Sequence, residues 1–260
     1  MTIDRAEFFS AVRASFGALR QGQVDGLNAI LDQWEACGGG DDRHFAYMLA
    51  TVWHETGPVN KPGHMKPIKE YGGEKYFTRM YDITGERPAK ARELGNLSPG
   101  DGARYCGRGY VQLTGRANYA RAALKVDADL INKPDLAMDP GIAARVMFRG
   151  MAEGWFTGKK LSDYNGGGEE YDAENARRII NGTDKAQTIA GYYRKFLVAL
   201  LASHKEAPVA VPPPPDVEPI EPKDPTPAHV KALVAAVVTA LAALAAYLGI
   251  DADTLKSFIP

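Results

Sequence analysis

Two motifs about fifty residues apart contain the residues of this chain that are best suited to acid–base catalysis and substrate binding. The first, His54-Glu55-Thr56-Gly57, places a carboxyl group at the end of an apolar run. The second reads Tyr105-Cys106-Gly107-Arg108-Gly109-Tyr110-Val111-Gln112-Leu113-Thr114-Gly115-Arg116. Aromatic rings can cover the faces of sugars while their polar groups bond outward, and small residues let a polymer approach. A carboxyl group beside such a segment indicates a carbohydrate groove with acid–base chemistry.

Together the two motifs resemble the catalytic signature of glycoside hydrolase family 19, which comprises chitinases and phage endolysins with a lysozyme-like fold. The resemblance runs from about residue 5 to about residue 203. It implies an inverting mechanism, in which one carboxylic acid protonates the leaving oxygen and a carboxylate activates water.

Glu55 is the expected general acid. It follows an apolar segment and sits beside Trp53 and His54, and apolar surroundings favour the protonated form of a carboxyl group. A Glu that only caps or pairs at a helix end is the alternative, and the family resemblance favours catalysis. We expect His54 at the substrate site as a packed residue that hydrogen-bonds near Glu55.

Glu70 is the expected general base, because it follows Glu55 on the segment where the family places that residue. Glu74 and Asp101 are the alternatives. An inverting pair of carboxyl groups lies roughly 6.5–9.5 Å apart, which leaves room for a water molecule between them.

Thr114 resembles the family hydroxyl residue that helps to hold this water, because a hydroxyl both donates and accepts hydrogen bonds. It could equally cap the helix that follows. Gln112 offers an amide donor and acceptor that suit an N-acetyl group, and Tyr110 is expected to line the groove with it. Tyr105 could stack on a sugar ring or belong to the core.

A late segment, 175–182, resembles a family motif in which an Arg and an Asn border the active site. Arg178 is the expected partner of a buried carboxylate, with Arg177 as an equally placed rival. Asn181 supplies the amide, and Asn165 lies in a nearby glycine-rich loop that could contact substrate.

Other classes of chemistry find little support. The helical zinc motif His-Glu-x-x-His fails because Pro58 follows Glu55 by three residues, so we expect neither metal nor cofactor. A net charge of −1 argues against a nucleic-acid partner. Two cysteines are too few for a disulfide framework, and we expect both thiols to be free and buried.

Apolar residues at helical spacing predict the elements that must position these motifs. The expected helices are a first with Phe8, Val12 and Phe16, a second over 23–34, a third from Asp41 or Asp42 to Glu55, and others over 117–124, 141–152, 172–180 and 185–203. Residues 59–101 are polar and glycine-rich, which predicts long loops with a short hairpin. The predicted class is therefore mainly α, a lysozyme-like domain with long active-site loops.

The last part of the chain differs in composition. We predict a catalytic domain over 1–206, a proline-rich linker over 207–228, and a hydrophobic helix over 229–260. Residues 232–250 carry no charge and match the length of one membrane span. A helix that docks on a partner, or a marginal free helix, would have the same composition.

The resulting expectation is an endolysin-type glycosidase that cleaves the β-1,4 bond between N-acetylmuramic acid and N-acetylglucosamine in peptidoglycan. It would wait in the host cytoplasm, tethered to the inner membrane through 232–250, because the first residues lack the pattern of a secretory signal. The alternatives are a chitinase and a non-catalytic wall-binding module held by its C-terminal helix.

Overall fold

The computed structural model describes residues 2–57, 63–168 and 170–204, and this part of the chain is mainly α-helical, as predicted. In order, its elements are α1 (Arg5–Phe16), α2 (Gln21–Ala36), α3 (Asp42–Glu55), β1 (Ile68–Lys69), α4 (Glu74–Tyr81), α5 (Pro88–Glu93), α6 (Asp101–Arg104), β2 (Arg108–Gly109), α7 (Arg116–Val126), η1 (Pro134–Met138), α8 (Pro140–Glu153), η2 (Leu161–Tyr164), η3 (Asn175–Ile179) and α9 (Ala186–Ser203). The three η elements are short 3₁₀ helices.

Helix α3 is the central element, and it carries Glu55 as its last residue. Asp41 caps its first turn, where the carboxylate accepts a hydrogen bond from the backbone N–H of Arg43 at 2.8 Å. The nine residues from Phe45 to Trp53 are all buried, so the helix is enclosed on every side. A carboxyl group at its end is therefore held on a rigid support.

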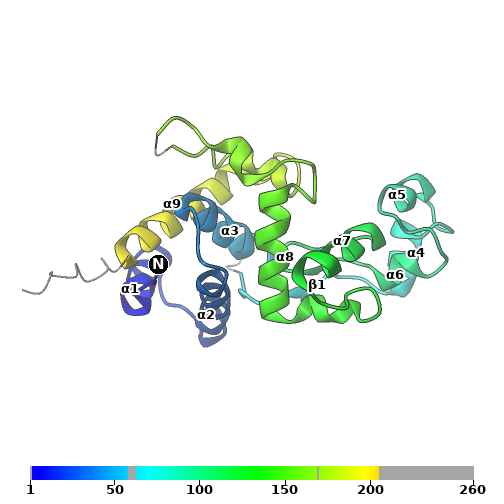
Figure 1. Cartoon of the computed structure of the whole chain (residues 1–260), viewed down its shortest axis with the longest axis horizontal. Helices are drawn as coiled ribbons and strands as arrows, with labels where there is room; N and C mark the ends of the chain where they lie inside the picture. The colour runs from blue at the N-terminus through cyan, green and yellow to red at the C-terminus, as the bar shows by residue number, and fades with distance from the viewer. Residues whose placement is uncertain (1, 58–62, 169, 205–260) are drawn as a thin grey trace, which may run out of the picture. The chain divides into compact units, whose positions relative to one another are not determined.

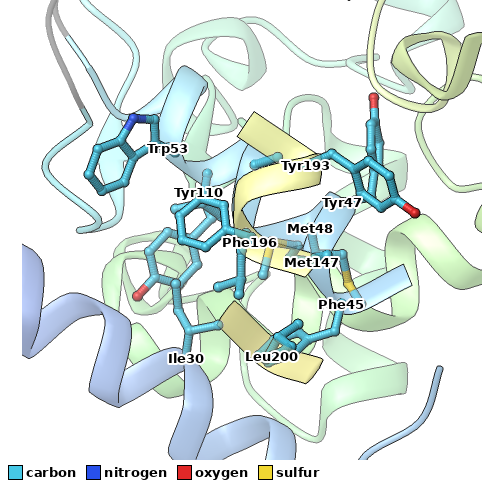
Figure 2. Packing of buried hydrophobic residues seen from close by; sticks show 14 of the residues in the cluster. Ile30, Phe45, Tyr47, Met48, Trp53, Tyr110, Met147, Tyr193, Phe196 and Leu200 are labelled. Carbon is cyan, nitrogen blue, oxygen red and sulfur yellow. The ribbon is translucent and has the colours of Figure 1, made fainter. Parts of the chain in front are cut away.

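Helix α9 packs against both α3 and α1, and Figure 1 shows it running close to both. Figure 2 shows Phe196 and Leu200 of α9 among the side chains of α3 and Ile30 of α2. The ends of this unit also meet, because Ile3 forms a bridge with His204 and the backbone N–H of Asp4 donates to the carbonyl of Ser203 at 2.8 Å. The His204 ring contacts the Asp42 carboxylate at the start of α3.

Helix α8 joins two apolar clusters, and in Figure 1 it stands between α1–α3 and the group formed by α4–α7. Met147 belongs to the larger cluster around α3. Its neighbour Val146 belongs to a smaller cluster with Tyr119 of α7 and Trp155. The two clusters thereby bring residues 105–126 against the α3 core.

The prediction of long loops over residues 59–101 is wrong for much of this segment, which contains α4 and α5 and the start of α6. Helix α4 carries Tyr76, Phe77, Met80 and Tyr81 at helical spacing, so the sequence contains an apolar period that the prediction of loops overlooked. The expected short hairpin within this segment is also wrong. Strand β1 instead pairs antiparallel with the distant β2, in the register Ile68 to Gly109 and Lys69 to Arg108.

The first structural unit comprises Met1–Ala207 and the second Pro208–Pro260. The predicted linker over 207–228 and the predicted hydrophobic span over 232–250 lie outside the described residues, so both stay predictions. Within the described ranges, no helix combines the length and apolar character needed to cross a membrane. Both cysteines are free, and Cys106 is buried as expected whereas Cys37 is exposed.

Candidate active site

The position of Glu55 is fixed by the way in which α3 ends. Thr56 caps the helix through its backbone N–H and donates its hydroxyl to the carbonyl of Val52 at 2.7 Å. The same hydroxyl accepts from the backbone N–H of Met65 at 3.0 Å, and the N–H of His64 donates to the Thr56 carbonyl at 3.1 Å. The returning chain is therefore fastened to the helix end beside Glu55, just before β1.

Pairing of β1 with β2 places Glu70 against the glycine-rich motif. The backbone N–H of Glu70 donates to the carbonyl of Gly107 at 2.8 Å, which extends the two-residue ladder by one bond. The Glu70 carboxylate accepts hydrogen bonds at both oxygens, from the Tyr81 hydroxyl at 2.7 Å and from the Gly107 N–H at 3.2 Å. The orientation of the Glu70 carboxylate is therefore fixed by one donor on α4 and by another in the turn before β2.

Gly107 leaves room for three polar groups. A Cβ at this position would lie 2.7 Å from Gln112 Oε1, 3.1 Å from Glu70 Oε2 and 3.2 Å from Thr114 Oγ1. The Thr114 hydroxyl donates to the carbonyl of Gln112 at 2.8 Å, and Gln112 Nε2 donates to the carbonyl of Ile68 at 3.1 Å. A carboxylate, a hydroxyl and an amide oxygen therefore surround the space that a side chain at position 107 would fill.

The side chain of Arg108 stabilises this turn by hydrogen bonds to its backbone. Its buried guanidinium donates to the carbonyls of Arg104 and Cys106 and to the hydroxyl of Tyr119 at 3.0–3.1 Å, and it pairs with Asp135 at 2.8 Å. The motif thus owes part of its rigidity to a buried charged residue, which is only 4% exposed.

Glu55 forms an ion pair with Arg177, the third residue of η3. Arg177 Nη1 donates to Glu55 Oε1 at 2.5 Å, and Arg177 Nε donates to the carbonyl of Asp184 at 3.1 Å. The side chain of Arg177 is 4% exposed and that of Glu55 is 22% exposed. The carboxyl group therefore has a charged partner, rather than the purely apolar surroundings that the sequence predicted.

Glu55 and Glu70 line the same cavity, which has a volume of about 490 Å³. Its polar wall also contains Tyr81, Lys90, Gln112, Thr114, Asn118 and Asn181, and its apolar wall contains Leu94, Val111, Phe156 and Ile180. Two carboxyl groups, several amides and hydroxyls, and apolar side chains in one open cavity suit the cleavage of a polar polymer with apolar ring faces.

Five of the predicted site residues meet in this cavity: Glu55, Glu70, Gln112, Thr114 and Asn181. The two alternatives for the base lie elsewhere. Glu74 is exposed at the first turn of α4 and lines a different cavity. The buried carboxylate of Asp101 accepts from the backbone N–H groups of Leu97 and Ser98 at 3.1 and 3.0 Å, which is a structural role.

The two tyrosines predicted to touch substrate are instead core residues. Tyr105 is 2% exposed, and its hydroxyl donates to the carbonyl of Ile131 at 3.2 Å. Tyr110 is 1% exposed and packs in the larger apolar cluster, where Figure 2 shows it near Phe196. Burial raises the pKa of the Tyr110 hydroxyl well above its ordinary value. The β2 turn sends these rings inward, and Tyr81 and Phe156 are the aromatic residues in the cavity wall.

Three further predictions need correction or refinement. His54 is half-buried beside Glu55, and the cavity wall, as the described residues form it, does not include its ring; burial lowers the pKa of His54 below its ordinary value. Asn165 bonds His44 at 2.8 Å, and His44 precedes Glu55 on α3 by 11 residues, about 16 Å along a helix. Arg178 is exposed and contacts Asn175, so Arg177 is the partner of Glu55.

Sequence reasoning missed Tyr81, Lys90 and Asn118 as members of the site. Tyr81 and Lys90 lie in the segment that was expected to be loop, although Tyr81 follows Phe77 by four residues, which is a helical spacing. Asn118 follows Thr114 by four residues and donates to its carbonyl at 2.9 Å, so the helical spacing after Thr114 could have indicated it.

Comparison with known proteins assigns a family to this arrangement. Residues 35–161 match the model of glycoside hydrolase family 19, described as chitinase class I. Residues 35–161 therefore form a glycoside hydrolase family 19 domain. Both carboxyl groups of the cavity, Glu55 and Glu70, fall within the matched residues, whereas Arg177 lies beyond them.

Parts of this chain are similar to one plant protein and to bacterial proteins of known structure. An acidic endochitinase of Petunia hybrida is 30% identical over 118 residues, which are 45% of this chain and 39% of that protein. The match therefore spans about two fifths of the curated relative. Chitinase C of Streptomyces griseus has a solved structure with a TM-score of 0.47 and 22% identity, over 78% of this chain and 95% of that one. A bacterial family 19 chitinase gives a TM-score of 0.44 and 21% identity, over 77% and 95%.

Proposed function

We propose that the family 19 domain hydrolyses β-1,4 glycosidic bonds in polymers of N-acetylglucosamine, with inversion at the anomeric carbon. The observation that carries this proposal is the presence of Glu55 and Glu70 in the wall of one open cavity. The name of the petunia relative, an endochitinase, favours chitin over peptidoglycan. Peptidoglycan was the first expectation from the sequence, and it becomes the competing substrate in the test.

Glu55 is the general acid in this proposal. Arg177 occupies Oε1, so the proton is carried by Oε2 and passes from there to the leaving oxygen. Transfer of the proton leaves a carboxylate, which the guanidinium then stabilises by a charge-assisted hydrogen bond. The ion pair therefore favours the product of the proton transfer and fixes the direction in which Oε2 points.

Glu70 is the general base, and the orientation of the Thr114 hydroxyl explains how water is directed. The hydrogen of that hydroxyl is used in the bond to the Gln112 carbonyl, so Thr114 Oγ1 acts as an acceptor. A water that donates one hydrogen to Thr114 and the other to Glu70 Oε2 keeps a lone pair free. That lone pair attacks the anomeric carbon while Glu70 takes the proton.

The test is digestion of N-acetylglucosamine hexamer and of purified peptidoglycan by the full chain. We expect shorter N-acetylglucosamine oligomers whose new ends are first α-anomers by NMR, since inversion of a β bond gives that product. Glu55→Gln and Glu70→Gln should each lower kcat by at least about 10²-fold, the range for loss of an acid or a base.

Glu74→Gln is the matched control, because Glu74 is exposed, four residues from Glu70 and outside the cavity wall. Loss of activity in Glu74→Gln but not in Glu70→Gln would refute the assigned base. Cleavage of peptidoglycan with an intact hexamer would move the substrate to the bacterial cell wall. Binding of either polymer without cleavage would favour the alternative hypothesis of a non-catalytic binding module.

A further inference from the structure

The two oxygens of the Glu70 carboxylate have different surroundings. Oε1 accepts a hydrogen bond from the Tyr81 hydroxyl at 2.7 Å. Oε2 accepts from the Gly107 N–H at 3.2 Å and faces Thr114 and Gln112 across the Cβ position that Gly107 lacks. A carboxyl group held at both oxygens from two separate elements cannot rotate about its last bond without losing a hydrogen bond.

Tyr81 is itself well supported. It is the last residue of α4, where its ring stacks with Phe77 at an interplanar angle of 16° and meets Tyr76 edge-on at 85°. Its carbonyl accepts from the side chain of Asn96 at 2.9 Å, and the buried Asn96 also accepts from the backbone N–H of Arg116 at 2.8 Å. The hydroxyl is therefore aimed at Glu70 by packing on one side and by a buried amide on the other.

The Tyr81 hydroxyl is a hydrogen-bond donor to Glu70. Burial raises its pKa well above the ordinary value of 10.0, and the neighbouring Glu70 carboxylate raises it further. A hydroxyl that keeps its proton can donate to Glu70 but cannot take a proton from water, so Tyr81 is not a second base.

We infer that Tyr81 is a positioning residue for the general base: by engaging Oε1, it reserves Oε2 of Glu70 for the water that Thr114 holds. This inference rests on the proposed function. Without the Tyr81 bond the carboxyl group would be free to turn Oε1 toward the water site or away from it, and the productive orientation would be occupied for only part of the time. The hydroxyl also stabilises the anionic form of Glu70, which is the form that accepts a proton.

Several charged or titratable groups surround Glu70 and contribute to its behaviour with pH. They are Lys69 next to it on β1, Cys106 at the turn before β2, Tyr81 of α4, Lys90 of α5 and Glu55 of α3. Removing the Tyr81 hydroxyl leaves the other four groups unchanged and takes away one donor to the carboxylate.

The test is Tyr81→Phe in the full chain, assayed on N-acetylglucosamine hexamer. We expect kcat to fall about tenfold to hundredfold, which is the effect of losing one hydrogen bond to a charged group. KM should stay within about twofold of wild type, because the hydroxyl that is removed is bonded to Glu70.

Tyr192→Phe is the matched control, since Tyr192 is also half-buried and packs near Phe16, away from the cavity wall. Thermal unfolding of both variants shows whether either has lost the fold. An unchanged kcat in Tyr81→Phe would overturn the inference, as would a rise in KM that accounts for the whole effect. Inactive wild-type enzyme would instead refute the proposed function, so the two failures are distinguishable.

Discussion

Replacement of Arg177 tests the assembly of this site most directly. Its guanidinium is nearly buried, and it links Glu55 at the end of α3 to the carbonyl of Asp184 ahead of α9. Arg177→Met keeps much of the side-chain volume while removing every donor. The variant leaves one partly buried carboxylate and one carbonyl without their partner.

The expected cost follows from the burial of the two partners. Removing one member of a fully buried ion pair destabilises a protein by about 3–5 kcal/mol. Glu55 is 22% exposed, so water compensates for part of this loss. We therefore expect Arg177→Met to lower the free energy of unfolding by about 2–3 kcal/mol. For a domain of this size, that corresponds to a fall in Tm of about 4–12 °C.

The assay is urea and thermal unfolding of a double-mutant cycle with Glu55→Gln. Gln carries no charge, so Arg177→Met should cost less in that background, with a coupling energy of about 1–2 kcal/mol. Arg178→Met is the control, because this neighbour is exposed and contacts Asn175, and it should change stability by less than about 0.5 kcal/mol. A coupling energy near zero, or a larger effect of Arg178→Met, would refute the reasoning.

Two other perturbations probe the site and its support. Gly107→Ala places a methyl carbon 2.7 Å from Gln112 Oε1 and 3.1 Å from Glu70 Oε2, so kcat on the hexamer should fall by more than about tenfold. A kcat within about twofold of wild type would show that the space between these groups tolerates a side chain. Burial alone would raise the pKa of the Asp82 carboxyl group, but hydrogen bonds from Thr84, Gly102 and Gly100 hold this pKa below its ordinary value of 3.8. The carboxylate therefore stabilises the fold fully above pH 3.8, and this contribution is lost as the pH falls through the lower pKa of the folded state. Asp82→Asn should therefore be about 2–3 kcal/mol less stable than wild type at pH 7, with a difference that shrinks below pH 3.8, whereas a constant difference in urea unfolding from pH 7 to pH 2 would contradict this account.

The helices with a strong apolar period could be predicted from the sequence, and so could the carboxyl group at the end of one of them. Helix α3 has both a capping Asp41 and a continuous buried run, and these two local signals agree on where Glu55 must lie. Helix α4 has apolar residues at helical spacing, but it has no side-chain cap and only eight residues, so the two local signals do not agree on it. Its position depends on packing against α6, which lies distant in sequence.

Within the site, composition identified the correct segments but not the direction of each side chain. Tyr105 and Tyr110 flank a two-residue strand that forms only when β1 pairs with it, so their inward orientation depends on a long-range contact. Arg177 and Arg178 lie on a 3₁₀ helix with about three residues per turn, which turns adjacent side chains roughly 120° apart. The sequence contains no cap or apolar period that would fix the rotation of so short an element.

The bridge between Ile3 and His204 gives the molecule a practical handle. Ile3 pairs with His204, and the His204 ring contacts Asp42 at the start of α3, so a surface or a fused protein attached ahead of residue 3 begins near that end of the helix. From there α3 runs 14 residues to Glu55, about 20 Å along a helix. Such an attachment therefore starts at the opposite end of α3 from the cavity, and a long glycan strand keeps its access to Glu55 and Glu70.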